Sequence, residues 1–328
     1  MRLDIARIEA ARRRIGAEFL STPQYVDTYL SEALGCRVVL KVETLNTIRC
    51  FKGRGVDAAL SALDGIDDDD RRRHVVAASA GNLGQALAYC GRRRGLAVTV
   101  TASAAANPIK LARMTSLGAD VRLVDGPIEA ALAAAEEFAR RTRATLIEDS
   151  KNLETCAGAG TIGLELAEGA ITPDIVLTSL GAGAMATGIG VAIRGRLPGV
   201  EVLTVQPERA AGMTMSWRAG HVVDAGPPST IADGVAGRYV IPEVLGDLLA
   251  VADDALLVRE TSIIEAMRLL YECAGLVVEP AAALGAASIL EDRARFRDAT
   301  VATVLCGSNV DPVDFDRWVR AGAASSRP

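Results

Sequence analysis

Short apolar runs alternate with helix-like segments along most of this chain, and this alternation limits the folds open to it. A first series reads HVVAAS (74–79), AVTVTA (97–102), DVRLV (120–124) and ATLIE (144–148). Helix-like stretches that begin near Asn82, Asn107 and Pro127 separate these runs. A second series reads DIVLTSL (174–180), VEVLTVQ (200–206), ALLVRE (255–260) and TVATVLC (300–306). Strands that are joined through helices pair in parallel and are covered by helices on both faces. The sequence therefore predicts an α/β fold with two open, mainly parallel twisted sheets flanked by helices.

Composition narrows the class of protein further. The 328 residues suffice for two domains, and a net charge of −5 with 4% aromatic residues predicts no nucleic-acid surface. No segment approaches the ~20 apolar residues of a membrane span, so no membrane partner is expected. The start, MRLDIARIEAARRRIG, lacks an apolar core and predicts a helix rather than a signal peptide. Six cysteines without a C-x-x-C pair indicate reduced thiols and a cytoplasmic location.

Histidine is too scarce for several kinds of chemistry. The chain has only His74 and His221, which argues against a multi-histidine metal site and against a Ser-His-Asp hydrolase. His74 opens an apolar run and is expected to be a strand residue.

The stretch IRCFKGRG (48–55) places Lys52 after an aromatic residue and inside a glycine-rich turn. One interpretation is a surface lysine at the start of a helix. The other is an amine held ready to form an imine with an aldehyde cofactor.

Three loops follow predicted strands, where ligands of open α/β sheets bind. SAGNLGQ (79–85) offers free backbone N–H groups to a carboxylate, although it also fits an ordinary N-cap. GAGAMATG (181–188) suits a phosphate; it also fits a dinucleotide fingerprint, but the next strand ends in Gln206 and Pro207 rather than in an acidic residue. CGSN (306–309) places a thiol where it can pair with a weakly basic ring nitrogen, or be simply a small buried cysteine.

Taken in order, six motifs resemble the fold type II pyridoxal-phosphate enzymes, which share the fold of the tryptophan synthase β chain. They are CFKGRG, SAGNLGQ, GAGAM, TIADGVAG (230–237), LVVEPAAALGA (276–286) and CGSNVD (306–311). Within that group the chain is most similar to the serine/threonine dehydratase (ammonia-lyase) and serine racemase family, from about residue 15 to 315. The resemblance implies pyridoxal 5'-phosphate as cofactor, a small amino-acid substrate and a homodimer. It also implies a large domain (1–45 and 150–328) and a small domain (46–149) that carries the lysine.

The resemblance assigns roles by matching position. Lys52 resembles the Schiff-base lysine and proton-transferring base, and Phe51 the residue that shapes the cofactor site. Asn82 is expected to hydrogen-bond the cofactor's 3-hydroxyl, Cys306 to face the pyridine nitrogen, and Glu279 to lie near the ring edge. The phosphate loop matches Gly181, Ala182, Gly183, Ala184 and Met185. The loop for the substrate carboxylate comprises Ser79, Ala80, Gly81, Asn82 and Leu83.

Four positions depart from the family pattern. Ala182 and Ala184 replace glycines of the phosphate loop, which requires a negative φ at both. Leu83 stands where histidine is common. Ala80 replaces the serine that serves as the second base in racemases, which favours elimination. Gln206 replaces a glutamate that ligates metal in metal-activated members, so no metal site is expected.

These observations predict a pyridoxal-phosphate-dependent dehydratase that converts a serine- or threonine-like β-hydroxy amino acid to a 2-oxo acid and ammonia. The alternatives are β-replacement or racemisation of a related amino acid, and a dinucleotide-binding or catalytically silent protein. Arg49 raises one more alternative, because it is either a surface arginine or the partner of a second substrate carboxylate, as in 3-hydroxyaspartate.

Overall fold

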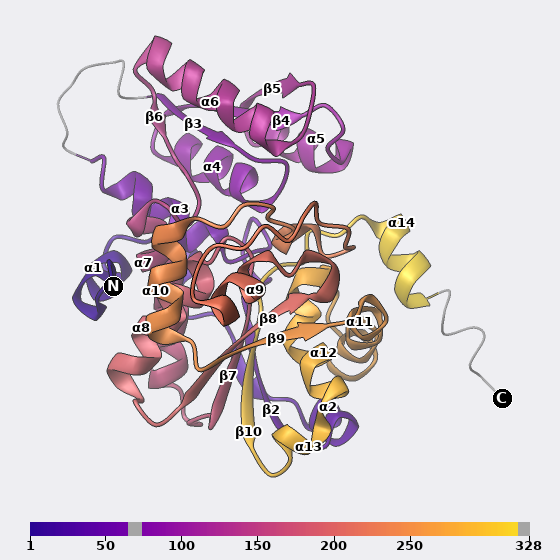
Figure 1. Cartoon of the computed structure of the whole chain (residues 1–328). Coiled ribbons are helices and arrows are strands. Elements are labelled where there is room, and N and C mark those ends of the chain that lie inside the picture. The colour runs from indigo at the N-terminus through magenta and orange to yellow at the C-terminus, as the bar shows by residue number, and fades with distance from the viewer. Residues whose placement is uncertain (65–73, 321–328) are drawn as a thin grey trace.

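Two separate sheets organise the chain in the computed structural model, which describes residues 1–64 and 74–320. The larger sheet has six strands in the order β1-β2-β10-β7-β8-β9, and the smaller has four in the order β5-β4-β3-β6. Figure 1 shows the smaller sheet with its helices at the top and the larger sheet below. The expected fold class, two mainly parallel sheets flanked by helices, is confirmed.

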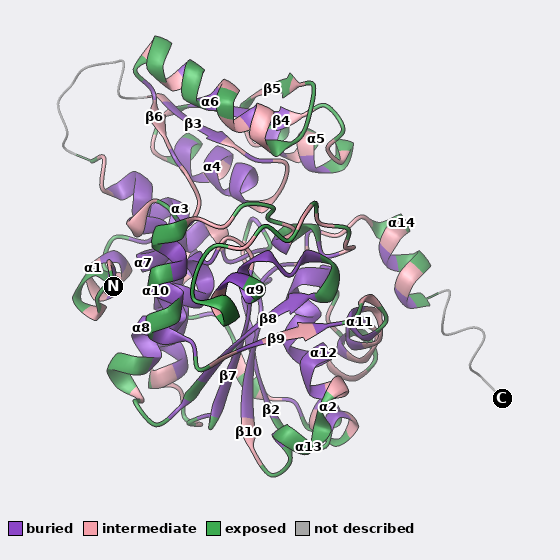
Figure 2. Ribbon diagram, viewed as in Figure 1, coloured by how far each residue is buried: buried purple, intermediate pink, exposed green. Residues whose placement is uncertain are grey.

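The larger sheet is parallel except at one edge, where β1 runs antiparallel to β2. Its strands are β1 (Gln24–Val26), β2 (Arg37–Val42), β7 (Ile175–Ser179), β8 (Glu201–Pro207), β9 (Asp254–Val258) and β10 (Thr300–Leu305). Its helices are α1 (Ile5–Arg12), α2 (Thr28–Leu34), α7 (Leu153–Glu168), α8 (Ala184–Arg196), α9 (Gly212–Ala219), α10 (Pro242–Val251), α11 (Glu260–Ala274), α12 (Leu284–Glu291), α13 (Arg293–Phe296) and α14 (Pro312–Phe315). The purple, buried strands at the centre of Figure 2 show that helices cover this sheet on both faces.

The smaller sheet is parallel throughout. Its strands are β3 (His74–Ala78), β4 (Ala97–Ser103), β5 (Asp120–Val124) and β6 (Thr145–Leu146). The helices of this part of the chain are α3 (Lys52–Ser61), α4 (Asn82–Arg93), α5 (Pro108–Ser116) and α6 (Ile128–Thr142). All four strands lie within the segment expected to form the small domain, while the domain boundaries themselves stay a prediction.

Local signals account for several element ends. The side chain of Asn107 accepts a hydrogen bond from Ile109 N–H at 2.8 Å and so caps α5. Asp27 caps α2 in the same way through Leu30 N–H, and Gly35 ends that helix with a φ of 80°. The three helices predicted to begin near Asn82, Asn107 and Pro127 are α4, α5 and α6.

All eight predicted strands are present, and the sequence-based prediction missed only β1 and β2 among the described residues. Strand β2 contains Lys41, whose charge interrupts the apolar pattern. Lys41 is nevertheless buried, because its Nζ lies 2.6 Å from Glu165 Oε2 on α7. A pattern of apolar residues cannot register a charge that a distant partner neutralises.

Candidate active site

One cavity of about 360 Å³ lies at the carboxyl ends of β3, β7 and β10. This volume lies in the range of small-molecule sites, and the position is the one where open α/β sheets bind ligands. Every predicted site residue except Arg49 lines it. Those lining residues are Phe51, Lys52, Ser79, Ala80, Gly81, Asn82, Leu83, Gly181, Ala182, Gly183, Ala184, Met185, Glu279 and Cys306.

Lys52 is the first residue of α3 and reaches the cavity because its loop is joined to the end of β10. Phe51 N–H donates to the Cys306 carbonyl at 2.9 Å, and Cys50 forms an antiparallel bridge with Gly307. The Lys52 Nζ lies 4.6 Å from the centre of the Phe51 ring. It also lies 2.5 Å from Asp149 Oδ2. The lysine is therefore a half-buried amine inside the cavity and not a free surface side chain.

The loop after β3 turns its backbone toward the same cavity. The Ser79 hydroxyl oxygen accepts hydrogen bonds from Gly81 N–H at 3.2 Å and Gly84 N–H at 3.0 Å. Ser79 therefore caps α4, and its own O–H remains a donor for a ligand. Both interpretations of this loop, a helix cap and a ligand-binding turn, are compatible in one geometry.

Asn82 connects the two sheets. Its Nδ2 donates to Glu279 Oε1 at 2.8 Å, and its Oδ1 accepts from Asn309 Nδ2 at 2.8 Å. Asn309 N–H donates to the other Glu279 oxygen at 3.2 Å. The three side chains form a network between α4 and the loops that flank β10, and this network forms part of the cavity wall.

Glu279 is buried, and its electrostatic surroundings differ from those of a surface carboxylate. Burial raises the pKa of Glu279 to about 7, and the Asp233 carboxylate raises it further. The Lys110 ammonium and the Asn82 donor oppose that rise in the pKa. Near neutral pH this carboxyl group is poised between its charged and its neutral form.

The loop Gly181–Met185 joins β7 to α8 and fits an anion. Gly183 has a φ of 106°, and a Cβ there would lie 2.5 Å from Val244 Cγ1, so only glycine is accommodated. Ala182 and Ala184 do not have positive φ values, which confirms the condition stated for them. The first N–H groups of a helix have no partner within the helix and face an incoming anion. Ala184 N–H is bonded to Ser150 Oγ at 2.9 Å.

Cys306 ends β10 and is buried in the cavity wall. Burial raises the pKa of its thiol well above the usual value, and the Glu279 carboxylate adds to that rise. A thiol of this kind stays neutral. The lysine amine, the phosphate-binding loop and the neutral thiol together fit pyridoxal phosphate.

Two residues that the sequence analysis singled out lie elsewhere. Arg49 is exposed and outside the cavity lining, because its left-handed turn (φ of 56°) directs its carbonyl to Ser308 N–H at 2.9 Å. The structure therefore gives no support for its binding a second carboxylate. Gln206 is buried, and its Oε1 accepts from Thr214 N–H at 2.8 Å at the start of α9.

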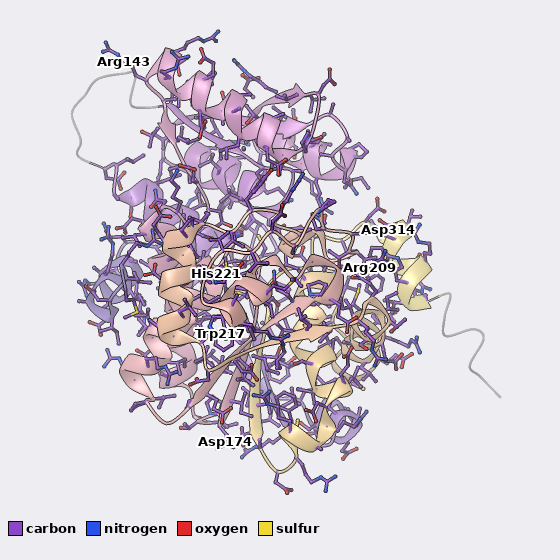
Figure 3. All side chains as sticks on the ribbon, viewed as in Figure 1. Arg143, Asp174, Arg209, Trp217, His221 and Asp314 are labelled. Atoms are coloured by element: carbon purple, nitrogen blue, oxygen red, sulfur yellow. The ribbon has the colours of Figure 1, made fainter. Side chains whose placement is uncertain are left out.

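Both histidines lie away from the cavity lining. His74 opens β3, as predicted, and its Nε2 lies 2.9 Å from Thr99 Oγ1. His221 is exposed in the loop after α9 (Figure 3), where its Nδ1 lies 3.0 Å from the Ala219 carbonyl.

The sequence analysis missed several charged residues of the cavity. Asp149 follows β6 by three residues, and Lys110 lies in the first turn of α5. Lys110 Nζ forms an ion pair with Asp233, which belongs to the TIADGVAG motif. A charged residue just after a strand was the available signal for Asp149. No sequence signal paired Lys110 with Asp233, which lies 123 residues away.

Relatives of known name cover nearly the whole chain. A protein of Sinorhizobium fredii named as a threonine dehydratase is 32% identical over 94% of this chain and 93% of its own. The L-threonine ammonia-lyase of Thermotoga maritima is 31% identical over 97% of this chain and 79% of its own. The L-threo-3-hydroxyaspartate ammonia-lyase of a Pseudomonas species is 30% identical over 88% of this chain and 90% of its own.

Solved structures give the same result. A bacterial threonine deaminase, from the organism abbreviated T.th., superposes with a TM-score of 0.86 at 32% identity, covering 94% of this chain and 99% of that one. Maize serine racemase superposes with a TM-score of 0.90 at 26% identity, covering 99% of each chain. The family profile described as "Pyridoxal-phosphate dependent enzyme" matches residues 20–307. The predicted cofactor is thereby confirmed, and the chain belongs to the pyridoxal-phosphate-dependent enzyme family.

Proposed function

We propose that this enzyme dehydrates a serine- or threonine-like β-hydroxy amino acid and releases a 2-oxo acid and ammonia. The observation that carries the proposal is the position of Lys52, which lies in one cavity with the 79–83 loop and the 181–185 loop. The names of the similar proteins support the same reaction class.

Each part of the cavity has a task in this reaction. Lys52 holds the cofactor and, once substrate has displaced it, removes the proton from the α-carbon. The 79–83 loop binds the substrate carboxylate through backbone N–H groups and the Ser79 hydroxyl. The 181–185 loop at the start of α8 binds the cofactor phosphate, and Glu279 and Asn82 shape the ring edge. When bound, pyridoxal phosphate supplies the electron sink for loss of the α-proton.

Cys306 favours elimination through its neutrality. The buried thiol does not protonate a pyridine nitrogen, which limits how far negative charge accumulates on the ring. A limited accumulation favours prompt loss of the β-hydroxyl over slower routes such as racemisation.

Lys52→Ala tests the proposal. The wild-type protein is expected to show the visible absorption of a lysine Schiff base, to lose it with borohydride, and to form 2-oxo acid and ammonia. Lys52→Ala is expected to lose the absorption and the turnover, while Lys151→Ala, which removes an exposed lysine, keeps both. A wild-type protein without the absorption would overturn the proposal.

Racemisation and β-replacement are the competing reactions within the family. Ala80 offers no hydroxyl to return a proton to the opposite face of the α-carbon. We expect Ala80→Ser to gain measurable racemisation of serine by chiral chromatography, whereas wild type yields 2-oxo acid. A wild-type protein that incorporates an added thiol into its product would instead be a β-replacement enzyme.

A hydroxy dicarboxylate such as 3-hydroxyaspartate is a second candidate substrate, because a cation, Lys110, lines the cavity. Lys110→Met is then expected to lower kcat/KM for 3-hydroxyaspartate more than for threonine. Arg49→Ala tests the original hypothesis, and unchanged selectivity in that variant would reject it.

We further propose a cytoplasmic homodimer in which each chain has a large domain (1–45 and 150–328) and a small domain (46–149). In residues 1–64 and 74–320, every helix is too short or too polar to cross a membrane. Light scattering is expected to give about twice the chain mass of 34.2 kDa.

A further inference from the structure

The contact between Lys52 and Asp149 leaves one carboxylate oxygen unused. Asp149 Oδ2 lies 2.5 Å from Lys52 Nζ, and both side chains line the cavity. The other oxygen, Oδ1, is buried and has no hydrogen-bond partner among the residues that the structure describes. A buried polar atom without a partner costs free energy, so its presence at a site calls for a functional reason.

The neighbours of Asp149 are engaged elsewhere. Glu148 Oε1 lies 3.1 Å from Lys151 Nζ in an outward pair, and the Ser150 hydroxyl accepts from Ala184 N–H. Asp149 is thus the carboxylate of this loop that reaches the lysine. Its Oδ1 is free to accept a proton or an N–H from a molecule in the cavity.

We propose that Asp149 is a catalytic residue that holds the proton on the Lys52 ε-amino group during turnover. The proposal rests on the proposed dehydration. The α-carbon–hydrogen bond breaks and its proton moves to Lys52 Nζ, forming an ammonium beside the Asp149 carboxylate. The electron pair of that bond forms the Cα–Cβ double bond while the Cβ–O bond breaks. The ammonium then returns the proton to the departing hydroxyl, which leaves as water, and both side chains regain their starting state.

Two features of the geometry favour a charged Nζ at this point. The Asp149 carboxylate lies at hydrogen-bond distance, with the two side chains only 17% and 22% exposed, so water screens the attraction incompletely. The face of the Phe51 ring lies 4.6 Å from the same nitrogen and adds a cation–π contact. The ammonium that forms when the proton arrives is thus stabilised where it forms.

Turnover of the holoenzyme provides the first test. Asp149→Asn keeps the shape of the side chain and removes its charge, and we expect kcat to fall about 10²-fold, the lower range for acid–base residues. The isotope effect with α-deuterated substrate is expected to rise, because proton removal becomes rate-limiting. Asp149→Glu is expected to restore part of kcat. Glu148→Gln, which removes the same charge one residue away, is the matched control and is expected to behave as wild type.

A second measurement does not depend on turnover. The full chain, freed of cofactor, is treated with an acylating reagent at neutral pH, and the acylation of Lys52 is followed by peptide mass spectrometry. Asp149→Asn is expected to acylate about tenfold faster than wild type, because the carboxylate no longer retains a proton on the amine. Glu148→Gln is expected to match wild type.

The two measurements separate the two proposals. Wild-type rates of acylation and of turnover in Asp149→Asn would overturn the role of Asp149. If the wild type dehydrates no β-hydroxy amino acid but Asp149→Asn still accelerates acylation, the proposed reaction fails and the proton-holding contact stands. If Asp149→Asn does not fold, wild-type acylation and turnover in a folded Asp149→Ser would overturn the proposal.

Discussion

Helix α3 carries two cationic side chains two residues apart, Lys52 and Arg54, and their surroundings differ. Arg54 is fully buried and lies 2.8 Å from Glu43 Oε2 and 2.7 Å from Glu165 Oε1. Lys52 is half-buried and bonded to Asp149, whose second oxygen has no partner among the described residues. One cluster has every donor satisfied, and the other has an acceptor left over.

The Arg54 cluster extends through further polar groups. Its two terminal nitrogens also donate to Thr161 Oγ1 at 2.9 Å and Thr22 Oγ1 at 3.1 Å, and Lys41 Nζ lies 2.6 Å from Glu165 Oε2. All three guanidinium nitrogens are used. A saturated, buried network of this kind holds one geometry, so it fixes the start of α3, whereas the unsaturated pair remains available for chemistry.

Removing Arg54 is expected to have the largest effect on stability. Arg54→Ala leaves the buried Glu43 and Glu165 with Lys41 as their remaining cation, and removing one partner of a buried pair costs about 3–5 kcal/mol. We expect a loss of that size in urea unfolding. Lys52→Ala breaks a half-exposed pair and is expected to cost about 1 kcal/mol or less. Equal losses in the two variants would contradict the comparison.

Acid titration sharpens the same comparison. Burial raises the pKa of Glu165, but the Arg54 and Lys41 contacts outweigh it and lower the pKa from 4.5 to about 2. Because the folded pKa is depressed, the stabilisation is present above pH 4.5 and is lost as the pH falls toward about 2. Glu165→Gln is expected to be less stable than wild type at neutral pH, with the difference shrinking over that window. Thermal unfolding of the cofactor-free protein at several pH values measures it.

The cavity carboxylate Glu279 is expected to show the opposite sign with a smaller effect. Burial raises its pKa from 4.5 to about 7, so its contribution to stability is present below pH 4.5 and is lost as the pH rises through about 7. In the cofactor-free protein, Glu279→Gln is expected to flatten the dependence of Tm on pH between 5 and 8. A steeper dependence in the variant would show that another group titrates there.

The sequence predicted the sheets well because apolar runs and helix caps are local signals. HVVAAS, AVTVTA and DVRLV became strands β3, β4 and β5, and Asn107 caps α5. It missed β2, because the charge of Lys41 is compensated by Glu165, 124 residues away. Such long-range pairing leaves no periodicity in the chain.

The candidate site divides in the same way. Loops after strands identified Ser79, Gly181 and Cys306, because the carboxyl ends of parallel strands meet at one edge. Arg49 was proposed from its distance to Lys52 along the chain, yet its backbone turn leaves it exposed. Asp149 reaches Lys52 only through the packing of the smaller sheet against α3, which spacing does not encode.

Divalent cations are expected to have the smallest effect, because Gln206 resembles the Arg54 cluster rather than the Lys52 pair. Its Oε1 is already bonded to Thr214 N–H, so the amide contributes to the start of α9 and carries no charge for a metal. We expect EDTA to change kcat/KM less than about twofold and added Mg²⁺ to restore nothing, since a neutral amide replaces the charge that hard cations require. Gln206→Glu places a charge at a site only 1% exposed and is expected to destabilise the protein. A loss of activity with chelator that Mg²⁺ reverses would instead require a cation site that Gln206 does not form, and would break the parallel between Gln206 and Arg54.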